Sequence, residues 1–238
     1  MALRRNMHNL GKLVGLAVLL FMAGANSGSA EGEKFNYKLD EKKLLSGGIQ
    51  VFEKQYQVEG EGIKKRVVGV MLLEAPRDKV WKVLENWDAM GPFVPGLDYN
   101  KTIHIFEPLG NKNKIGNSLI EGQIKVLYLS INYTLDVKFD QANYRQDWKL
   151  VTDDQVEAYN QKKIPVKKAN RGLKNIEGFE YIEPYGDGSS TIYYYAPVVE
   201  TAIPIPGIVE RALARNTLNG YMEAIREMVK NYEKNQAR

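Results

Sequence analysis

Apolar side chains fall on every second position of the stretch VLYLSINYTLDVKFD, and this alternation is the clearest pattern in the chain. Leu129, Ile131, Tyr133, Leu135 and Phe139 alternate there with polar residues. Such a period predicts an antiparallel strand over 125–140, with one dry face and one wet face. Weaker patterns between Asn, Gly and Pro turns predict further strands at 47–58, 63–75, 99–107, 115–123, 144–151, 175–183 and 190–199.

Two segments show helical spacing instead. After Pro76, a favourable first helical residue, Val80, Leu84 and Trp87 recur at the spacing of one helix face. From Pro206 to the chain end, a longer stripe contains Leu218, Met222, Ile225 and Val229. A long helix must bury its stripe and a sheet must cover its dry face, so we expect the terminal helix to lie on the sheet.

The first 30 residues have the layout of a secretory signal. Arg4 and Arg5 precede an apolar run at 13–25, and small residues follow up to Ala30. The alternative is an uncleaved anchor, although the run is shorter than the roughly 20 residues that span a bilayer. We therefore predict a signal peptide at 1–30, a flexible charged lead-in at 31–46 and one domain at 47–238, exported to the bacterial periplasm.

The composition of the exported domain argues against several kinds of binding and catalysis. Removing the signal takes three basic residues and no acidic one from totals of 33 and 29, so the remaining chain is nearly neutral, which argues against nucleic-acid binding. The chain has no Cys, and after the signal it keeps one His, His104. Nucleophilic triads and zinc sites usually draw on these residues, so we expect no metal, no cofactor and no catalytic residue of that kind. Catalysis by Asp, Glu or Tyr stays open.

Three stretches read together resemble the START-like, or SRPBCC, superfamily. VVGVMLLEAPRDKVWKVLENWDAMGPFVPGL resembles its first strand, helix and apolar turn. GFEYIEPYGDGSSTIYYY resembles its late hairpin, and AIPIPGIVERALARNTLNGYMEAIRE resembles its entry into the terminal helix. The similarity covers roughly residues 63–235 and is greatest to the polyketide cyclase/dehydrase and lipid-transport-like branch.

The resemblance implies an α+β helix-grip fold, in which a curved antiparallel sheet of about seven strands wraps around a long C-terminal helix. This chain adds a strand at 47–58 and a polar insertion at 152–173, which could reshape one end of the cavity. The family implies a cavity between sheet and helix and a hydrophobic partner such as a lipid, a sterol or a polyketide. It does not imply one activity, because carriers, cyclases and regulators share the fold.

Two groups of residues are candidates for that cavity. Large apolar side chains in the turn after the first helix would form a lip, or would pack under the terminal helix instead: Trp87, Met90, Phe93, Val94 and Pro95. Aromatic and small polar residues would form the wall, although each is also compatible with an ordinary core: Tyr133, Trp148, Tyr193, Tyr195, Asn216 and Gly220.

A basic run within the insertion is a candidate surface for an anionic membrane or an envelope partner, or a solvated loop. It comprises Lys162, Lys163, Lys167, Lys168, Arg171 and Lys174. The sequence therefore predicts an exported carrier or sensor of a hydrophobic ligand. The alternatives are a cyclase or dehydrase that uses the same cavity, and an interaction domain with a filled core.

Overall fold

The architecture is one antiparallel sheet crossed by a long helix. It is seen in a computed structural model that describes residues 37–58, 62–110, 114–126, 129–169, 173–201 and 207–236, so the predicted signal peptide lies outside the described residues. The strand order is β1-β2-β8-β7-β6-β5-β4-β3, and every neighbouring pair is antiparallel. The strands are β1 (Gln50–Val58), β2 (Gly62–Leu73), β3 (Leu97–Glu107), β4 (Ile115–Val126), β5 (Leu129–Asp140), β6 (Arg145–Leu150), β7 (Leu173–Tyr185) and β8 (Ser190–Thr201).

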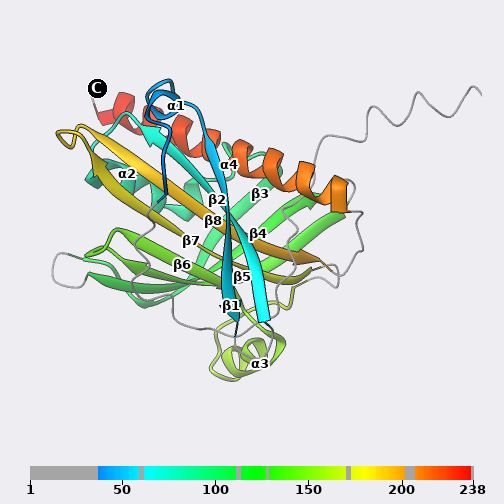
Figure 1. The fold of residues 1–238 in the computed structure, drawn as a ribbon. Helices are drawn as coiled ribbons and strands as arrows, with labels where there is room; N and C mark the ends of the chain where they lie inside the picture. The colour runs from blue at the N-terminus through cyan, green and yellow to red at the C-terminus, as the bar shows by residue number, and fades with distance from the viewer. Residues whose placement is uncertain are drawn as a thin grey trace, which may run out of the picture.

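Helix α4 (Gly207–Gln236) crosses the sheet and is drawn in orange and red in Figure 1. Its predicted stripe of Leu218, Met222, Ile225 and Val229 is buried. α2 (Arg77–Leu84) begins directly after Pro76, and a 3-10 turn, η2 (Trp87–Ala89), follows it. Within the described part of the chain, the backbone of α4 lies closest to those of α2 and β2. The prediction of a helix laid on a curved sheet is confirmed.

We call the face of the sheet beneath α4 the inner face, and its side chains form the main core. Alternation places Tyr133, Leu135 and Val137 of β5 on this face. Thr134 points the other way, yet it is also buried. The predicted wet face is therefore partly covered by other segments of the chain.

The insertion covers part of this second, outer face. α3 (Asp153–Gln161) starts with a capping box between Thr152 and Gln155, and the chain then folds back along the sheet. An apolar cluster fixes it there; its buried members are Leu119, Val151, Val156, Ile164 and Val166. The part of the insertion from Val156 to Val166 lies on the face opposite α4, whereas Ala169 packs against the main core. Figure 1 shows α3 on the far side of the sheet from α4.

The segment before β1 covers another part of the outer face. Leu44, in α1 (Glu41–Leu45), is 1% exposed, and the Tyr37 ring stacks on Phe52 at 4.7 Å. Gln50 ties the segment down, because its side chain donates to the Asp40 carbonyl at 2.9 Å and accepts from the Asp40 N–H at 2.8 Å. Within the predicted lead-in at 31–46, residues 37–46 thus contact the sheet, while 31–36 lie outside the described residues.

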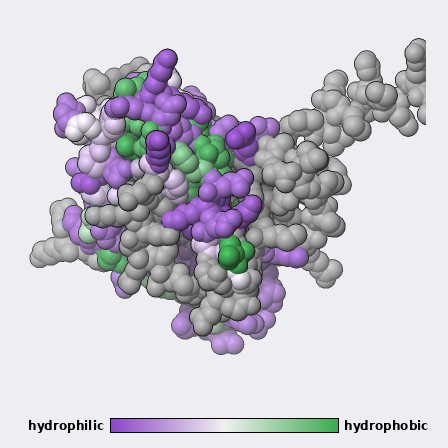
Figure 2. All heavy atoms as spheres, viewed as in Figure 1, coloured by the Kyte–Doolittle hydropathy of each residue, from purple (hydrophilic) through white to green (hydrophobic). Residues whose placement is uncertain are grey.

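Hydrophilic side chains dominate the described surface seen in Figure 2, with green areas that are small and separate. Large apolar side chains that are exposed in the described part of the chain include Ile63, Ile105 and Phe106. Among the described helices, none has the length and hydropathy needed to cross a bilayer. The apolar residues of the described fold are thus concentrated between its layers.

Candidate functional site

Helix α4 meets the sheet closely at β2 because β2 carries a glycine there. A Cβ on Gly69 would lie 2.3 Å from the Met222 Sδ and 2.8 Å from the Leu218 Cδ2. A glycine in a strand commonly marks such a close approach. Over β6, β7 and β8, by contrast, the interval between helix and sheet is spanned by long aromatic side chains.

These rings form what we call the interior aromatic cluster. Tyr221 of α4 stacks on Tyr195 of β8 with ring centroids 4.2 Å apart. Tyr195 also stacks on Tyr193 at 6.5 Å and on Trp148 at 5.9 Å. Trp148 meets the edge of Trp87 at 5.8 Å. The structure therefore brings together three predicted wall residues and one predicted lip residue.

A carboxyl group, Glu180, lies within the cluster. It belongs to β7, pairs across the strands with Tyr195 and Gln146, and is 1% exposed. Its Oε1 accepts hydrogen bonds from the hydroxyls of Tyr193 at 2.6 Å and Tyr221 at 2.8 Å. Its Oε2 accepts from the side-chain amide of Gln146. A buried carboxylate needs such partners, since an isolated charge in the core is very unfavourable.

The orientation of Gln146 is set by Trp87. The indole N–H can only donate, and it donates to Gln146 Oε1 at 3.1 Å. This contact fixes the other end of the amide, whose Nε2 donates to Glu180 and to the Leu84 carbonyl at 3.3 Å. The tryptophan predicted to line a lip therefore works deeper inside, by aiming the amide of Gln146 at Glu180.

Burial sets the acid strengths in this cluster. Desolvation raises the pKa of Glu180, while the hydrogen bonds from Tyr193, Tyr221 and Gln146 act in the opposite direction. Desolvation, followed by the nearby Glu180 charge, raises the pKa of the Tyr193 and Tyr221 hydroxyls well above the ordinary value. Both phenols therefore stay protonated and act as donors at neutral pH.

Tyr133 forms a second polar contact on the inner face. Its hydroxyl donates to Asn100 Oδ1 at 2.8 Å, and Asn100 in turn lies 3.8 Å from the Met90 sulfur. Gly122 makes room for this pair, because a Cβ there would lie 2.4 Å from the Tyr133 hydroxyl. Tyr133 is buried, and desolvation raises its pKa. The predicted wall residue is thus part of the core beneath α4.

The apolar turn does not form the predicted lip as a whole. Trp87 is 6% exposed and Met90 is fully buried, so both belong to the core under α4 rather than to a wetted rim. Phe93 and Val94 are partly buried against that core, and Pro95 is exposed. The turn carries large apolar side chains chiefly because α4 lies over it.

The two predicted wall residues of α4 are placed differently from expectation. Asn216 is exposed and takes no part in the interior aromatic cluster. Gly220 is half-buried, and a Cβ there would meet Pro95 Cγ at an ordinary 3.5 Å. Gly220 thus faces the apolar turn, and the missing side chain leaves no special room toward the sheet.

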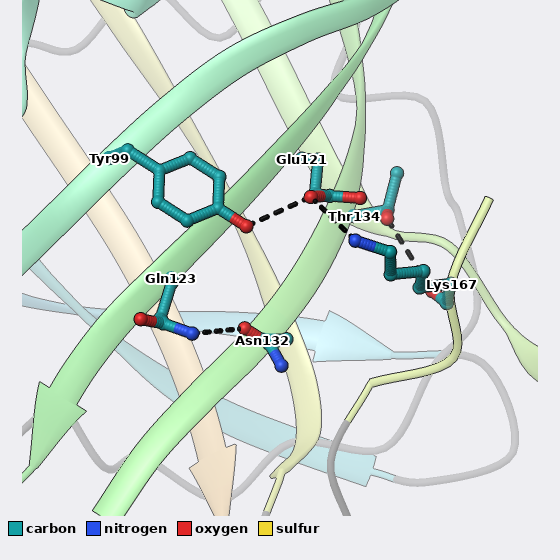
Figure 3. A network of polar contacts seen from close by, with 6 residues as sticks. All are labelled: Tyr99, Glu121, Gln123, Asn132, Thr134 and Lys167. Atoms are coloured by element: carbon teal, nitrogen blue, oxygen red, sulfur yellow. Dashed lines mark hydrogen bonds and ion pairs between the residues drawn. The ribbon is translucent and has the colours of Figure 1, made fainter. Parts of the chain in front are cut away.

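The predicted basic surface is partly neutralised by acids from other elements. Figure 3 shows Lys167 reaching Glu121 on the outer face, where the Lys167 Nζ lies 3.2 Å from an oxygen that also accepts from Tyr99 at 2.9 Å. Lys168 pairs with Glu157 at 3.1 Å and with Asp153 at 3.5 Å. The other described lysines of the run, Lys162, Lys163 and Lys174, are exposed, and Arg171 lies outside the described residues.

Sequence reasoning missed the residue at the centre of the site. Glu180 alternates with Ile176, Gly178 and Ile182, all of them buried, so its place in that period was a signal that it points inward. Gln146 precedes Trp148 by two positions and shares its face for the same reason. In the described part of the chain no three His, Cys, Asp or Glu side chains gather as a metal site would require.

The comparisons identify the fold. No protein-family model and no curated protein matches the sequence. A START superfamily protein from Mycobacterium smegmatis is 15% identical, with a TM-score of 0.52 over 70% of this chain and 97% of that one. A STAR-related lipid transfer protein fragment from Xanthomonas axonopodis is 17% identical, with a TM-score of 0.54 over 77% and 94%. The chain therefore has a START/SRPBCC-like helix-grip fold, as the sequence predicted.

Proposed function

We propose that this protein binds a hydrophobic ligand between the inner face of the sheet and α4. The observation that carries the proposal is the interior aromatic cluster, which spans the interval between α4 and strands β6 to β8 and includes the buried Glu180. Small-molecule sites are mostly apolar and aromatic, with a few placed polar groups. The lipid transfer protein with the same fold supports this assignment.

The proposed role is that of an exported carrier or sensor. Moving a lipid tail of sixteen methylenes from a membrane into water costs about 13 kcal/mol of free energy, at about 0.8 kcal/mol per methylene. Unassisted transfer of the lipid between membranes is therefore slow. A protein interior that keeps the tail dry removes most of this barrier. Export rests on the signal-like residues 1–30, and contact with an anionic membrane or envelope partner rests on the exposed lysines of the basic run.

Glu180 supports a second candidate, an enzyme of the cyclase or dehydrase type. A buried carboxyl with a raised pKa is a common general acid or base. Asp136, by contrast, lies on the outer face, where Asn117 donates to it at 2.7 Å. Turnover of a bound ligand that is lost in Glu180→Gln, with binding retained, would favour the enzyme over the carrier.

Native mass spectrometry of protein purified from its native host tests the binding proposal. We expect the folded protein to carry one additional mass of a lipid-sized molecule, which is released under denaturing conditions. The same spectrum gives the chain mass, which we expect to correspond to cleavage after Ala30. Protein that carries no ligand, and that also fails to bind added apolar probes, would point to the filled-core interaction domain instead.

A further inference from the structure

Glu180 has one hydrogen-bonding position left after its described partners are counted. An ionised carboxylate offers about four lone-pair sites. Tyr193 and Tyr221 use two on Oε1, and Gln146 uses one on Oε2. All three partners donate, so what the carboxyl still accommodates is another donor.

Two of these donors are held by the sheet, and one comes from the helix. Tyr193 of β8 and Gln146 of β6 are fully buried, and the indole of Trp87 fixes the amide of Gln146. Tyr221 is only partly buried and belongs to α4. Its hydroxyl also lies 3.8 Å from the Met90 sulfur, which is a second acceptor within reach. Tyr221 is thus the donor that a molecule entering beneath α4 would displace most easily.

We infer that Glu180 recognises the polar end of the ligand and accepts a hydrogen bond from a hydroxyl or ammonium group, beside or in place of Tyr221. This inference rests on the proposed function. It names the ligand class as an apolar molecule with a hydrogen-bond donor at one end. A carboxylate end would meet an acceptor already surrounded by its own donors, and two like charges would then share a buried site.

The test uses three ligands with the same sixteen-carbon chain: hexadecanol, hexadecylamine and palmitate. Each displaces Nile red, a neutral apolar dye, from the purified full-length protein at neutral pH. We expect hexadecanol and hexadecylamine to displace the dye at concentrations about tenfold or more below that of palmitate, because the palmitate carboxylate would face the Glu180 carboxylate without a donor. The two donor ligands then distinguish a hydroxyl from an ammonium preference.

Two variants connect this preference to the carboxyl. In Glu180→Gln we expect the concentrations of palmitate and hexadecanol that displace the dye to differ by no more than about threefold. The substitution removes the charge and leaves one acceptor oxygen in place of two. In Tyr221→Phe, which keeps Glu180 and its sheet donors, we expect hexadecanol to bind more tightly while palmitate changes little. This second variant keeps the test valid if Glu180→Gln does not fold.

The outer face supplies matched controls, because Glu183 there accepts hydrogen bonds from Tyr194 and from Tyr181. Glu183→Gln and Tyr194→Phe repeat the chemical changes away from α4 and should leave the ligand ratio unaltered. Equal displacement by all three ligands in the native protein and both interior variants overturns the inference but keeps the proposed function. Failure of Nile red and of every ligand to bind overturns both.

Discussion

Replacing Gly178 by alanine is expected to lower the free energy of unfolding by about 2–3 kcal/mol, because it overpacks the centre of the inner face. A Cβ at this position would lie 2.6 Å from Trp148 Cζ2 and 2.7 Å from the carbonyl oxygen of Ala196. One neighbour is a rigid ring held by Trp87 and Tyr195, and the other is backbone of the adjacent strand. Neither can move without disturbing the interior aromatic cluster.

Urea denaturation measures this loss, and near-ultraviolet circular dichroism reports the displaced tryptophan. Gly110→Ala is the matched control, since nothing lies within 4 Å of a Cβ there. It should change stability by less than about 0.5 kcal/mol. If Gly178→Ala is as stable as the control, Trp148 does not lie against β7 as described.

The second large effect is a dependence of stability on pH that comes from Glu180. Its pKa is 4.5 in an ordinary setting and is raised in the folded protein, first of all by desolvation. The folded state therefore binds the proton more tightly than the unfolded state does. The contribution of Glu180 to folding stability is fully present below about pH 4.5. It is lost as the pH rises through the pKa of Glu180 in the folded state. Each tenfold weakening of the acid on folding corresponds to about 1.4 kcal/mol.

The comparison of native protein with Glu180→Gln isolates this contribution, because other carboxyl groups titrate alike in both. We expect the native protein to lose stability relative to the variant as the pH is raised from about 4 to 8. Glu183→Gln repeats the substitution on the outer face and serves as the control for a general effect of removing one carboxyl group. The described partners of Glu180 are Tyr193, Tyr221 and Gln146, and none of them titrates in this range. If the stability of the native protein minus that of Glu180→Gln stays constant or increases as the pH is raised, the pKa of Glu180 is not raised.

The sequence predicted the layers of this fold well because their burial is periodic. The alternating apolar residues of β5 and the apolar stripe of α4 are buried in the same core of the structure. The dry and wet faces were harder to separate. Phe179 and Glu180 are adjacent in β7 and both are buried, because the segment before β1 covers one face while α4 covers the other. Because both faces are covered, the only sequence signal that Glu180 points inward is the period it shares with Ile176, Gly178 and Ile182.

The structure places the predicted aromatic residues Tyr193, Tyr195 and Trp148 together on the inner face, and it buries Met90 of the predicted lip. Tyr193, Tyr195 and Trp148 share a face because they alternate along paired strands, which the sequence makes visible. Met90 is buried because α4 lies over its turn, and a contact between such distant segments leaves no local pattern. The partners of the basic run were hidden for the same reason, since Glu121 lies in β4 and reaches Lys167 only through the fold.

The account depends on a ligand that lies between α4 and the inner face, and photo-crosslinking tests this most directly. A long-chain alcohol with a photoreactive group on its chain is bound, irradiated and mapped by peptide mass spectrometry. We predict labels on interior residues such as Tyr133, Tyr195 and Met222, which excess hexadecanol abolishes. Labels confined to exposed apolar residues of the outer surface, such as Ile63 or Phe106, would contradict the account.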